Sequence, residues 1–361
     1  PHCFLVQLEE YETPQDIFSD YAYFSSYSTS WLAHAKAYTE EMMKDFGIDM
    51  SSHVVEVASN DGYLLQYFRQ AGVPVLGIEP AENVAEVARK ERDIPTVSEF
   101  FGETLAKRLR DEGKSADLLI GNNVLAHVPD INDFVEGLHV LLADEGFITM
   151  EFPHLLRLME KTQFDTIYHE HFSYLSLLTV QQIFAAHGLR VFHVQELPTH
   201  GGSLRIFACH EATARETRPS VAALLDAERA AGLDRIETYR AFTEKVRKVK
   251  RDLLACLIDL KRQGKTIVGY GAAAKGNTLL NYCGIRQDFL DYVADRSPHK
   301  QNTLLPGSRI PVVAPEEIER TRPDYVLILP WNLQEEIVKQ LDGIRAWGGK
   351  FIVPIPDVQV L

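Results

Sequence analysis

The sequence has few cysteines, and none of them form a closely spaced pair. Its 361 residues include only Cys3, Cys209, Cys256 and Cys283, which lie far apart along the chain. A small disulfide scaffold needs many cysteines at short spacing, and this chain has neither feature. We therefore predict a protein of a reducing compartment, the cytoplasm.

Other features that the sequence lacks exclude further classes. No apolar run approaches the 18 or more residues of a membrane span, and no signal peptide precedes the first predicted elements. Basic residues are outnumbered, 37 against 51 acidic ones, and the net charge of −14 opposes a nucleic-acid surface. We expect two or three globular domains, a small-molecule partner, and a monomer or small homo-oligomer.

One strand-turn-helix pattern stands out from the rest of the chain. The apolar strand 54–58 runs into Ser59-Asn60-Asp61-Gly62, and a helical pattern follows at once. The next strand, 73–78, ends in Glu79, where a carboxylate can reach ribose hydroxyls. The turn lacks the G-x-G-x-x-G of pyrophosphate binding. It suits a nucleoside without phosphates, of which S-adenosylmethionine (SAM) is the common one.

Strand and helix patterns alternate through residues 51–152. Five such steps predict a parallel, right-handed sheet whose ligands lie at the carboxyl ends of its strands. Gly121-Asn122-Asn123 ends the fourth strand and should lie beside the first turn. Two further strand patterns, 191–196 and 203–209, would complete seven strands with an antiparallel edge.

Four segments follow from these patterns. Residues 1–50 are aromatic and helical, and are either a lid that points Tyr21, Tyr23 and Ser25 hydroxyls into a site or an ordinary helical cover. Residues 51–211 are the main α/β domain. Residues 212–263 read as a helical connector, and residues 264–361 as a second, smaller Rossmann-like domain.

The segment Tyr168-His169-Glu170-His171 interrupts the α/β rhythm with titratable groups. A histidine base suits the removal of a proton from carbon next to a carbonyl, and a tyrosine or second histidine can stabilise the enolate. In extended backbone, His169 and His171 would share one face. A zinc or iron site and plain structural hydrogen bonding are the competing interpretations.

Two glycine-containing turns are also candidate sites. Gly269-Tyr270-Gly271-Ala-Ala-Ala274 resembles a dinucleotide turn, with Lys275 near a helix start and Asp295 at the next strand end. A turn that needs small residues for close packing is the alternative. His200-Gly201-Gly202-Ser203 is either a binding loop or a plain glycine turn.

Five motifs in this order resemble the SAM-dependent sugar C-methyltransferases, which act on nucleotide-linked 4-keto-deoxysugars. They are Glu56-Val-Ala-Ser-Asn-Asp-Gly62, Gly121-Asn-Asn-Val-Leu-Ala-His127, Tyr168-His-Glu-His171, His200-Gly-Gly-Ser203 and Gly269-Tyr-Gly-Ala-Ala-Ala-Lys-Gly-Asn277. The resemblance spans about residues 20–354. It implies a seven-stranded class I SAM-methyltransferase domain and a smaller Rossmann-like C-terminal domain that holds the nucleotide sugar.

The resemblance also assigns roles to residues. The catalytic residues implied are His171 as base, Tyr168, Glu170 and an N-terminal tyrosine, taken here as Tyr23. The cofactor residues expected are Glu56, Ser59, Asn60, Asp61, Gly62, Glu79, Phe101, Asn122, Asn123 and His127. The substrate residues expected are Tyr21, Ser25, His169, His200, Gly202, Tyr270, Lys275, Asn277 and Asp295. The family usually begins with a zinc module bearing several cysteines; only Cys3 stands here, so zinc stays open.

The sequence thus predicts a SAM-dependent C-methyltransferase of a nucleotide-linked, dTDP-type keto-sugar that works through an enolate. An O- or N-methyltransferase needs only a base beside a hydroxyl or amine, and is the first alternative. An NAD-dependent oxidoreductase or epimerase using the Gly269 turn is the second. A nucleotide-sugar binding protein without catalysis is the third.

Overall fold

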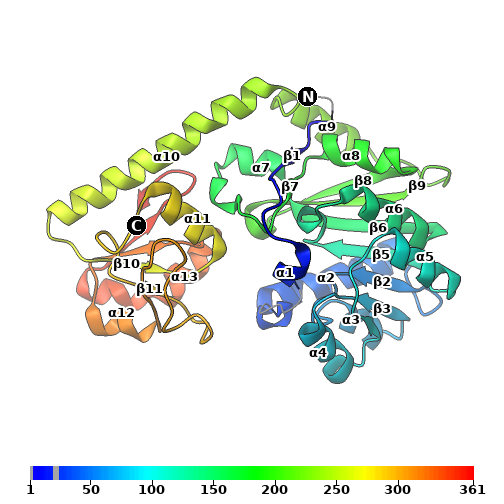
Figure 1. Ribbon diagram of the computed structural model, residues 1–361, viewed down its shortest axis with the longest axis horizontal. Coiled ribbons are helices and arrows are strands. Elements are labelled where there is room, and N and C mark those ends of the chain that lie inside the picture. Colours follow the sequence, from blue (N-terminus) through cyan, green and yellow to red (C-terminus); the bar gives the residue numbers. More distant parts are fainter. Residues whose placement is uncertain (1–2, 19–23) are drawn as a thin grey trace. The chain divides into compact units, whose positions relative to one another are not determined.

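The computed structural model describes residues 3–18 and 24–361 (Figure 1). Two compact units divide the chain: an N-terminal unit of Pro1–Leu155 and His169–Asp234, and a C-terminal unit of Leu156–Tyr168 and Arg235–Leu361. The chain therefore passes between the units three times, and one passage falls inside the Tyr168–His171 motif. Tyr21 and Tyr23 lie outside the described residues.

The N-terminal unit contains the predicted seven-stranded, mostly parallel sheet. Its spatial order is β4 (Thr96–Val97), β3 (Val75–Ile78), β2 (Val54–Val57), β5 (Ala116–Asn122), β6 (Leu142–Pro153), β9 (Ser203–His210) and β8 (Leu189–Leu197). The predicted antiparallel edge is confirmed: the edge strand β8 pairs antiparallel with β9, which is also antiparallel to β6. Strand β9 takes the inner place because nearly all of its residues are buried, whereas β8 alternates buried and partly exposed positions.

Helices cover this sheet because their apolar faces need burial. They are α2 (Thr29–Phe46), α3 (Leu65–Gln70), α4 (Glu82–Arg92), α5 (Glu103–Asp111), α6 (Ile131–Leu141), α8 (Leu177–Ala186) and α9 (Pro219–Ala230). Shorter elements are β1 (Val6–Gln7), which pairs with β7 (Ser173–Tyr174), α1 (Pro14–Phe18), η1 (Ser25–Tyr27), η2 (Leu125–His127) and η4 (Thr199–Gly201).

Helix α2 matters for the site because it packs on the sheet beside strand β2. Its start is fixed by Ser28, whose hydroxyl accepts the Trp31 amide at 3.3 Å, and Gly47 ends it at a φ of 76°. Tyr38 and Met42 are buried in the core that also contains strand β2.

The C-terminal unit contains the predicted second, smaller α/β domain. Its sheet order is β12 (Val312–Val313), β11 (Val293–Ala294), β10 (Ile267–Tyr270), β13 (Tyr325–Ile328), β14 (Lys350–Val353) and β15 (Gln359–Val360), and only β15 is antiparallel to its neighbour. The helical elements are α7 (Leu155–Glu160), η3 (Phe164–Thr166), α10 (Ile236–Arg262), α11 (Ala274–Cys283), α12 (Glu316–Thr321), η5 (Trp331–Leu333), α13 (Gln334–Gln340) and η6 (Asp342–Trp347).

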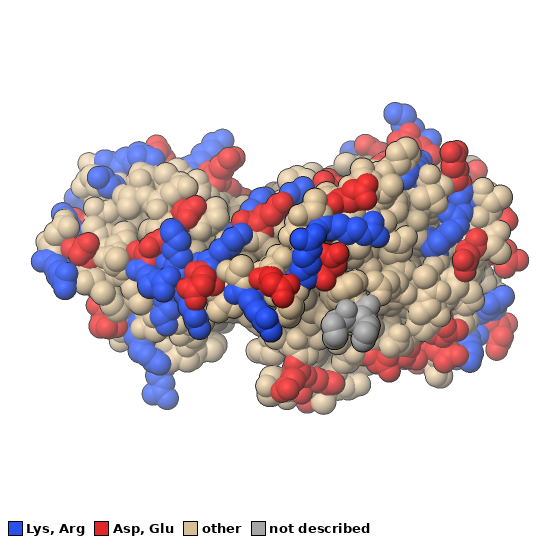
Figure 2. Space-filling model, turned by 90° about the horizontal axis from the view of Figure 1, so that it is seen from above, with Lys and Arg blue, Asp and Glu red and all other residues tan. Residues whose placement is uncertain are grey.

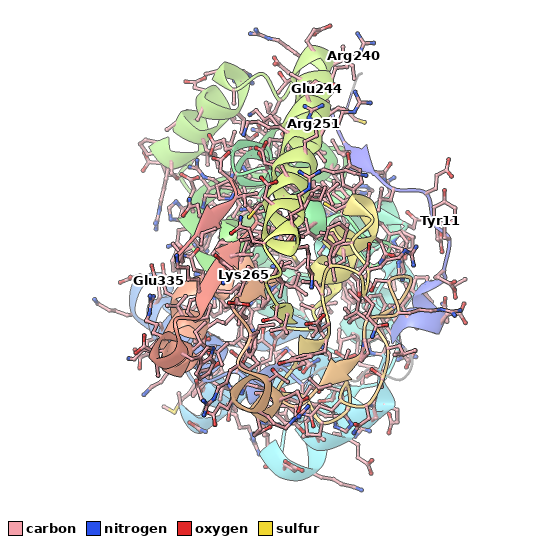
Figure 3. The ribbon with its side chains drawn as sticks, turned by 90° about the vertical axis from the view of Figure 1, so that its left-hand side faces the viewer. Tyr11, Arg240, Glu244, Arg251, Lys265 and Glu335 are labelled. Atoms are coloured by element: carbon pink, nitrogen blue, oxygen red, sulfur yellow. The ribbon has the colours of Figure 1, made fainter. Side chains whose placement is uncertain are left out.

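The 27-residue helix α10 belongs to this unit through one apolar stripe, which includes Leu253 and Leu257. Its polar side is crossed by ion pairs, such as those of Glu244 with Arg247 at 2.6 Å and Arg251 at 3.7 Å (Figure 3). Acidic and basic side chains are intermixed on the face drawn in Figure 2. Within the described residues, no helix is long and apolar enough to cross a membrane.

Candidate active site

The turn after β2 contains backbone conformations that few residue types adopt easily. Asn60 and Gly62 have φ values of 50° and 75°, and a Cβ added at Gly62 would lie 2.5 Å from Ile94 Cδ1. The Glu79 carboxylate fastens the turn, accepting the Asn60 amide at 2.9 Å and the Ala81 amide at 3.0 Å. The structure therefore brings together the turn and the acid that the sequence singled out.

Three carboxylates lie under this turn. Glu56 and Asp61 are fully buried, and Glu79 is 5% exposed. Burial raises the pKa of Glu56 well above its usual range, and the nearby Asp61 and Glu79 raise it further. Burial also raises the pKa of Glu79. The nearest paired cation is Arg92, 3.4 Å from Asp61, so the cluster is short of positive charge.

Several buried polar atoms at this edge of the sheet make no hydrogen bond within the described residues. They are both carboxylate oxygens of Glu56, Oγ of Ser59, Oδ1 of Asp61, and the side-chain oxygens of Asn122 and Asn123. Buried acceptors without partners are costly and are uncommon in native proteins. A cationic ligand that also carries hydroxyl and amine donors would satisfy them, and SAM has this chemistry.

The N-terminal segment contacts the same turn through hydrogen bonds. The Ser25 amide donates to Asn60 Oδ1 at 2.8 Å, and the Ser26 hydroxyl donates to the Asp61 carboxylate. The sequence pointed to Ser25 as a substrate residue, and the structure places its backbone amide against Asn60 of the turn after β2. Ser26 escaped notice, although its hydroxyl stood in the same aromatic and serine-rich stretch.

Two predicted cofactor residues have other neighbours. The Phe101 ring packs edge-on against Phe134 of α6, with ring centroids 5.3 Å apart. His127 lies beside His171 and Phe18 rather than beside the residues of the first turn, at centroid distances of 4.8 and 5.6 Å. Contact of either residue with the cofactor stays a prediction, and His127 lies beside the Tyr168–His171 segment.

The Tyr168–His171 segment is not the extended strand that the argument about shared faces assumed. Residues 168–170 form a bend and turn, and strand pairing begins only at Ser173. The turn replaces the extended form because only Ser173 and Tyr174 find a partner strand, β1. His169 is consequently exposed, whereas Glu170 and His171 are partly buried.

His127 and His171 form an edge-to-face pair whose ring centroids are 4.8 Å apart. His127 Nδ1 lies 2.8 Å from the Glu170 carbonyl oxygen, so Nδ1 carries the proton. Burial, and then the proximity of His171, lowers the pKa of His127 to about 3. His127 therefore stays neutral and does not oppose a positive charge on His171.

Burial raises the pKa of Glu170, which also lies near His169. The metal interpretation of this segment gains no support, since no group of three or more His, Cys, Asp or Glu side chains suited to a metal occurs in residues 3–18 and 24–361. The segment can therefore offer a ring nitrogen and a carboxyl group to a substrate.

The His200–Ser203 loop lies at the same edge. His200 has a φ of 52°, and its Nε2 lies 3.4 Å from Asn123 Nδ2. Its ring is 5.3 Å from that of Trp31. The buried Gly202 has a φ of 133°, which a side chain would disfavour. His200 is therefore held between α2 and the end of β5.

The C-terminal candidates gather at the carboxyl ends of β10 and β11. Asp295 accepts the Ala272 amide at 2.6 Å and the Ser297 amide at 2.8 Å, so it shapes the Gly271 turn. Lys275 donates to Asn332 at 2.8 Å and lies 5.1 Å from the centre of the Trp331 ring. The side-chain oxygen of Asn277 is buried without a hydrogen bond in the described residues.

Comparison with known proteins decides the family. A family model described as the C-methyltransferase C-terminal domain matches residues 198–356, and a methyltransferase domain model matches residues 32–194. The C-methyltransferase NovU of Streptomyces niveus is 38% identical over 359 residues, which cover 99% of this chain and 85% of NovU. The chain belongs to the C-methyltransferase family.

More distant relatives match only part of the chain. The ubiquinone biosynthesis O-methyltransferase of Bartonella quintana is 26% identical over 93 residues, covering 26% of this chain and 38% of that protein. Among solved structures, PH0226 of Pyrococcus horikoshii aligns with a TM-score of 0.43 and 15% identity, over 54% of this chain and 97% of that one.

The family confirms several expectations together. The protein is a SAM-dependent methyltransferase, and its fold is the predicted class I methyltransferase sheet with a second α/β domain. Of the described residues, those around the first turn fit SAM, because buried side-chain oxygens of Glu56, Ser59 and Asp61 that lack a hydrogen bond match the positive charge and donors of that cofactor. The family membership disfavours the oxidoreductase and binding-protein alternatives.

Replacing Glu79 with alanine should weaken SAM binding by on the order of 1–3 kcal/mol, the range for hydrogen bonds to charged groups. The amide of Asn60 in the turn and the amide of Ala81 would also lose their acceptor. Calorimetric titration with SAM checks this, and Glu82→Ala, whose carboxylate pairs with Arg89 on the surface of the adjoining helix, is the control. An unchanged dissociation constant in a folded Glu79 variant would refute the assignment.

Proposed function

We propose that this C-methyltransferase acts on a nucleotide-linked 4-keto-deoxysugar, with dTDP as the expected nucleotide, and that His171 is the base. The single observation that carries the proposal is the His127–His171 pair. The His127 ring is kept neutral by burial and by the proximity of His171, against the opposite effect of its bond to the Glu170 carbonyl, and the partly buried His171 ring lies beside it at 4.8 Å. A neutral neighbouring ring does not repel the proton that His171 would take from a weakly acidic carbon.

Bound SAM supplies a methyl group on a positively charged sulfur, which leaves as a neutral thioether when carbon attacks. His171 takes the proton alpha to the keto group, and the resulting enolate carbon forms the new bond to the methyl group. The His171 proton then passes to solvent. Glu170, with its raised pKa, serves the same site as a hydrogen-bond partner of the sugar. Tyr168, and Tyr21 or Tyr23 from the undescribed segment, are proposed to donate to the enolate oxygen.

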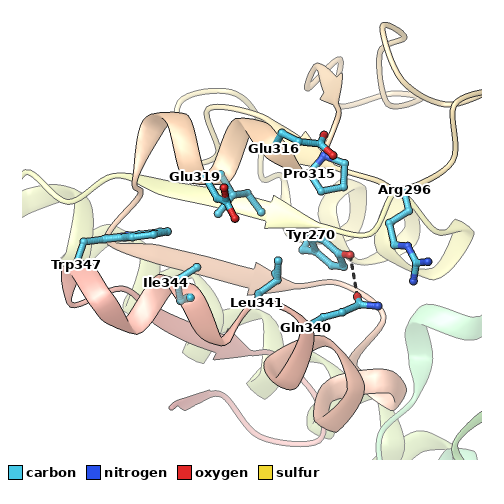
Figure 4. A pocket seen from close by; sticks show the side chains of 11 residues that line it. Tyr270, Arg296, Pro315, Glu316, Glu319, Gln340, Leu341, Ile344 and Trp347 are labelled. Atoms are coloured by element: carbon cyan, nitrogen blue, oxygen red, sulfur yellow. Dashed lines mark hydrogen bonds between the residues drawn. The ribbon is translucent and has the colours of Figure 1, made fainter.

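The nucleotide is proposed to bind the C-terminal unit at the Tyr270–Asn277 turn. A cavity of about 410 Å³ lies beside the first residue of this turn: Tyr270 lines it together with Arg296, Gln340, Trp347 and the carboxylates Glu316 and Glu319, whereas residues 271–277 do not (Figure 4). Tyr270 donates a hydrogen bond to Gln340 at 3.2 Å. Aromatic walls with a few polar groups are typical of sites for flat heterocycles, so a pyrimidine base suits this cavity.

Lys275→Ala should raise the Michaelis constant for the nucleotide sugar and leave SAM affinity unchanged. The lysine stands near the start of α11, where backbone amides already favour an anion. Steady-state kinetics and SAM calorimetry on the same variant measure the two effects. Lys261→Ala, on a surface ion pair of the same unit, is the matched control. An unchanged Michaelis constant would remove Lys275 from the nucleotide site.

The reaction itself is tested by mass spectrometry of mixtures of enzyme, SAM and a panel of nucleotide-linked keto-sugars. The expected product is heavier by one methyl group on carbon. Substrate deuterated alpha to the ketone should lose deuterium, which an O- or N-methyltransferase would retain. Methylation with full retention of deuterium would contradict the enolate route.

A further inference from the structure

The carboxylate of Glu151 lies at the carboxyl end of β6 and connects three segments of the N-terminal unit. Its Oε1 accepts the Thr199 hydroxyl at 3.0 Å from η4. Its Oε2 lies 2.8 Å from Arg205 of β9 and 2.9 Å from His34 Nε2 of α2. Glu151 is fully buried and Arg205 is 2% exposed, so this is a buried ion pair with all its carboxylate contacts made by side chains.

The charges keep Glu151 ionised despite its burial. Hydrogen bonds from His34 and Arg205, with their charges, hold its pKa at about 2 against the opposing effect of burial. An ionised carboxylate only accepts hydrogen bonds, so His34 Nε2 carries the proton that points to it. Arg205 is further held by Gln195 at 3.2 Å and by Glu41 at 3.5 Å.

Two of the residues tied to Glu151 sit next to residues that face the site. Thr199 precedes His200, whose left-handed backbone places its ring beside Trp31 and its Nε2 near Asn123. His34 stacks on the same Trp31 ring at 4.9 Å, and Trp31 also stacks on Tyr63 at 6.0 Å. The carboxylate thus anchors both sides of the Trp31–His200 contact.

We propose that Glu151 is a positioning residue for the methyl transfer: it fixes the Thr199–Gly202 turn, and through it His200, on the side of the site that receives the sugar. The inference rests on the proposed function, together with the expectation from the sequence that His200 contacts the substrate. A buried ion pair adds little net stability compared with an apolar substitute, because desolvation offsets the attraction. What the ion pair contributes is a fixed geometry of the Thr199–Gly202 turn.

Glu151→Gln would leave the buried Arg205 without its negatively charged partner and destabilise the fold, so the decisive variants are at Thr199. Thr199→Val removes the hydroxyl and keeps the shape of the side chain, whereas Thr199→Ser keeps the hydroxyl. Thr213→Val is the matched control, because Thr213 is 8% exposed, donates to the Asp144 carbonyl at 3.3 Å and lies near the opposite end of β6.

Thr199→Val should lower kcat/KM for the sugar about 10-fold or more, the factor that corresponds to losing a hydrogen bond to a charged group. SAM affinity by calorimetry should stay as in the unaltered enzyme, and Thr199→Ser should retain most of the activity. Thr213→Val should lower the melting temperature without this kinetic loss. Equal kcat/KM values for Thr199→Val and Thr213→Val would overturn the proposal.

A second measurement separates this inference from the proposed function. If the unaltered enzyme methylates no nucleotide-linked keto-sugar, the proposed function fails, and hydrogen exchange then tests the positioning role without any substrate. Amides of residues 199–202 should exchange faster in Thr199→Val than in Thr199→Ser. Equal exchange in the two variants would show that Glu151 does not hold the turn.

Discussion

Replacing His171 with asparagine should lower turnover by about 10²–10⁴-fold, the range for loss of a general base. Neither the SAM dissociation constant nor the Michaelis constant of the sugar should change much, since the imidazole acts on a proton that moves only in the transition state. Single-turnover kinetics measure the chemical step directly. A second readout is exchange of the alpha proton with solvent deuterium, which the unaltered enzyme should catalyse and His171→Asn should not.

The chain offers a matched control for this variant. His139 and His210 also form an edge-to-face pair, with centroids 4.7 Å apart, at the far end of β9. His210→Asn should leave turnover intact, and His169→Asn should cost less than His171→Asn because His169 is exposed. If His171→Asn still exchanges the alpha proton at the original rate, another residue is the base, and Tyr168 becomes the next candidate.

The parts of the fold that sequence predicts well are those set by buried apolar runs. Strands β2, β3 and β5 are short segments rich in apolar residues and almost entirely buried, and the parallel sheet follows from them. The place of β9 inside the sheet could not be read in this way, because a hairpin pattern does not state which of its strands pairs with β6. The docking of Leu156–Tyr168 with the C-terminal unit depends on contacts remote in sequence, such as Asp165 with Trp331 at 2.7 Å.

The candidate site also contains residues that the sequence predicts and residues that it does not. Glu79 was found because an acid at a strand end beside a polar turn has a known use. Glu151 ends its strand in the same manner and was missed, since its partners His34 and Arg205 come from distant segments. Arg205, a charged residue within an otherwise buried strand, was the one available signal that a buried carboxylate must lie opposite.

The buried carboxylates under the first turn lead to an expectation about pH. Glu56 is fully buried, has no hydrogen bond in the described residues, and its pKa is raised well above the ordinary glutamate value. A carboxyl group whose pKa is higher in the folded than in the unfolded chain binds more protons in the folded state. The free energy of unfolding therefore falls as the pH rises from the unfolded-state pKa through the folded-state pKa. SAM brings positive charge to this cluster and favours the ionised form. Binding should therefore release protons, and affinity should increase with pH across the same window.

Glu56→Gln should weaken SAM binding by on the order of 10–100-fold, the cost of losing a hydrogen bond to a charged partner. The same change should raise the melting temperature of the SAM-free protein above neutral pH, because it removes one of three neighbouring negative charges. Calorimetry in buffers of different ionisation enthalpy counts the protons released on binding, and the variant should release fewer than the unaltered enzyme. Glu136→Gln, on a surface pair with His187, is the control and should change none of these quantities. A variant that binds SAM as tightly and releases as many protons as the unaltered enzyme would show that Glu56 does not face the cofactor.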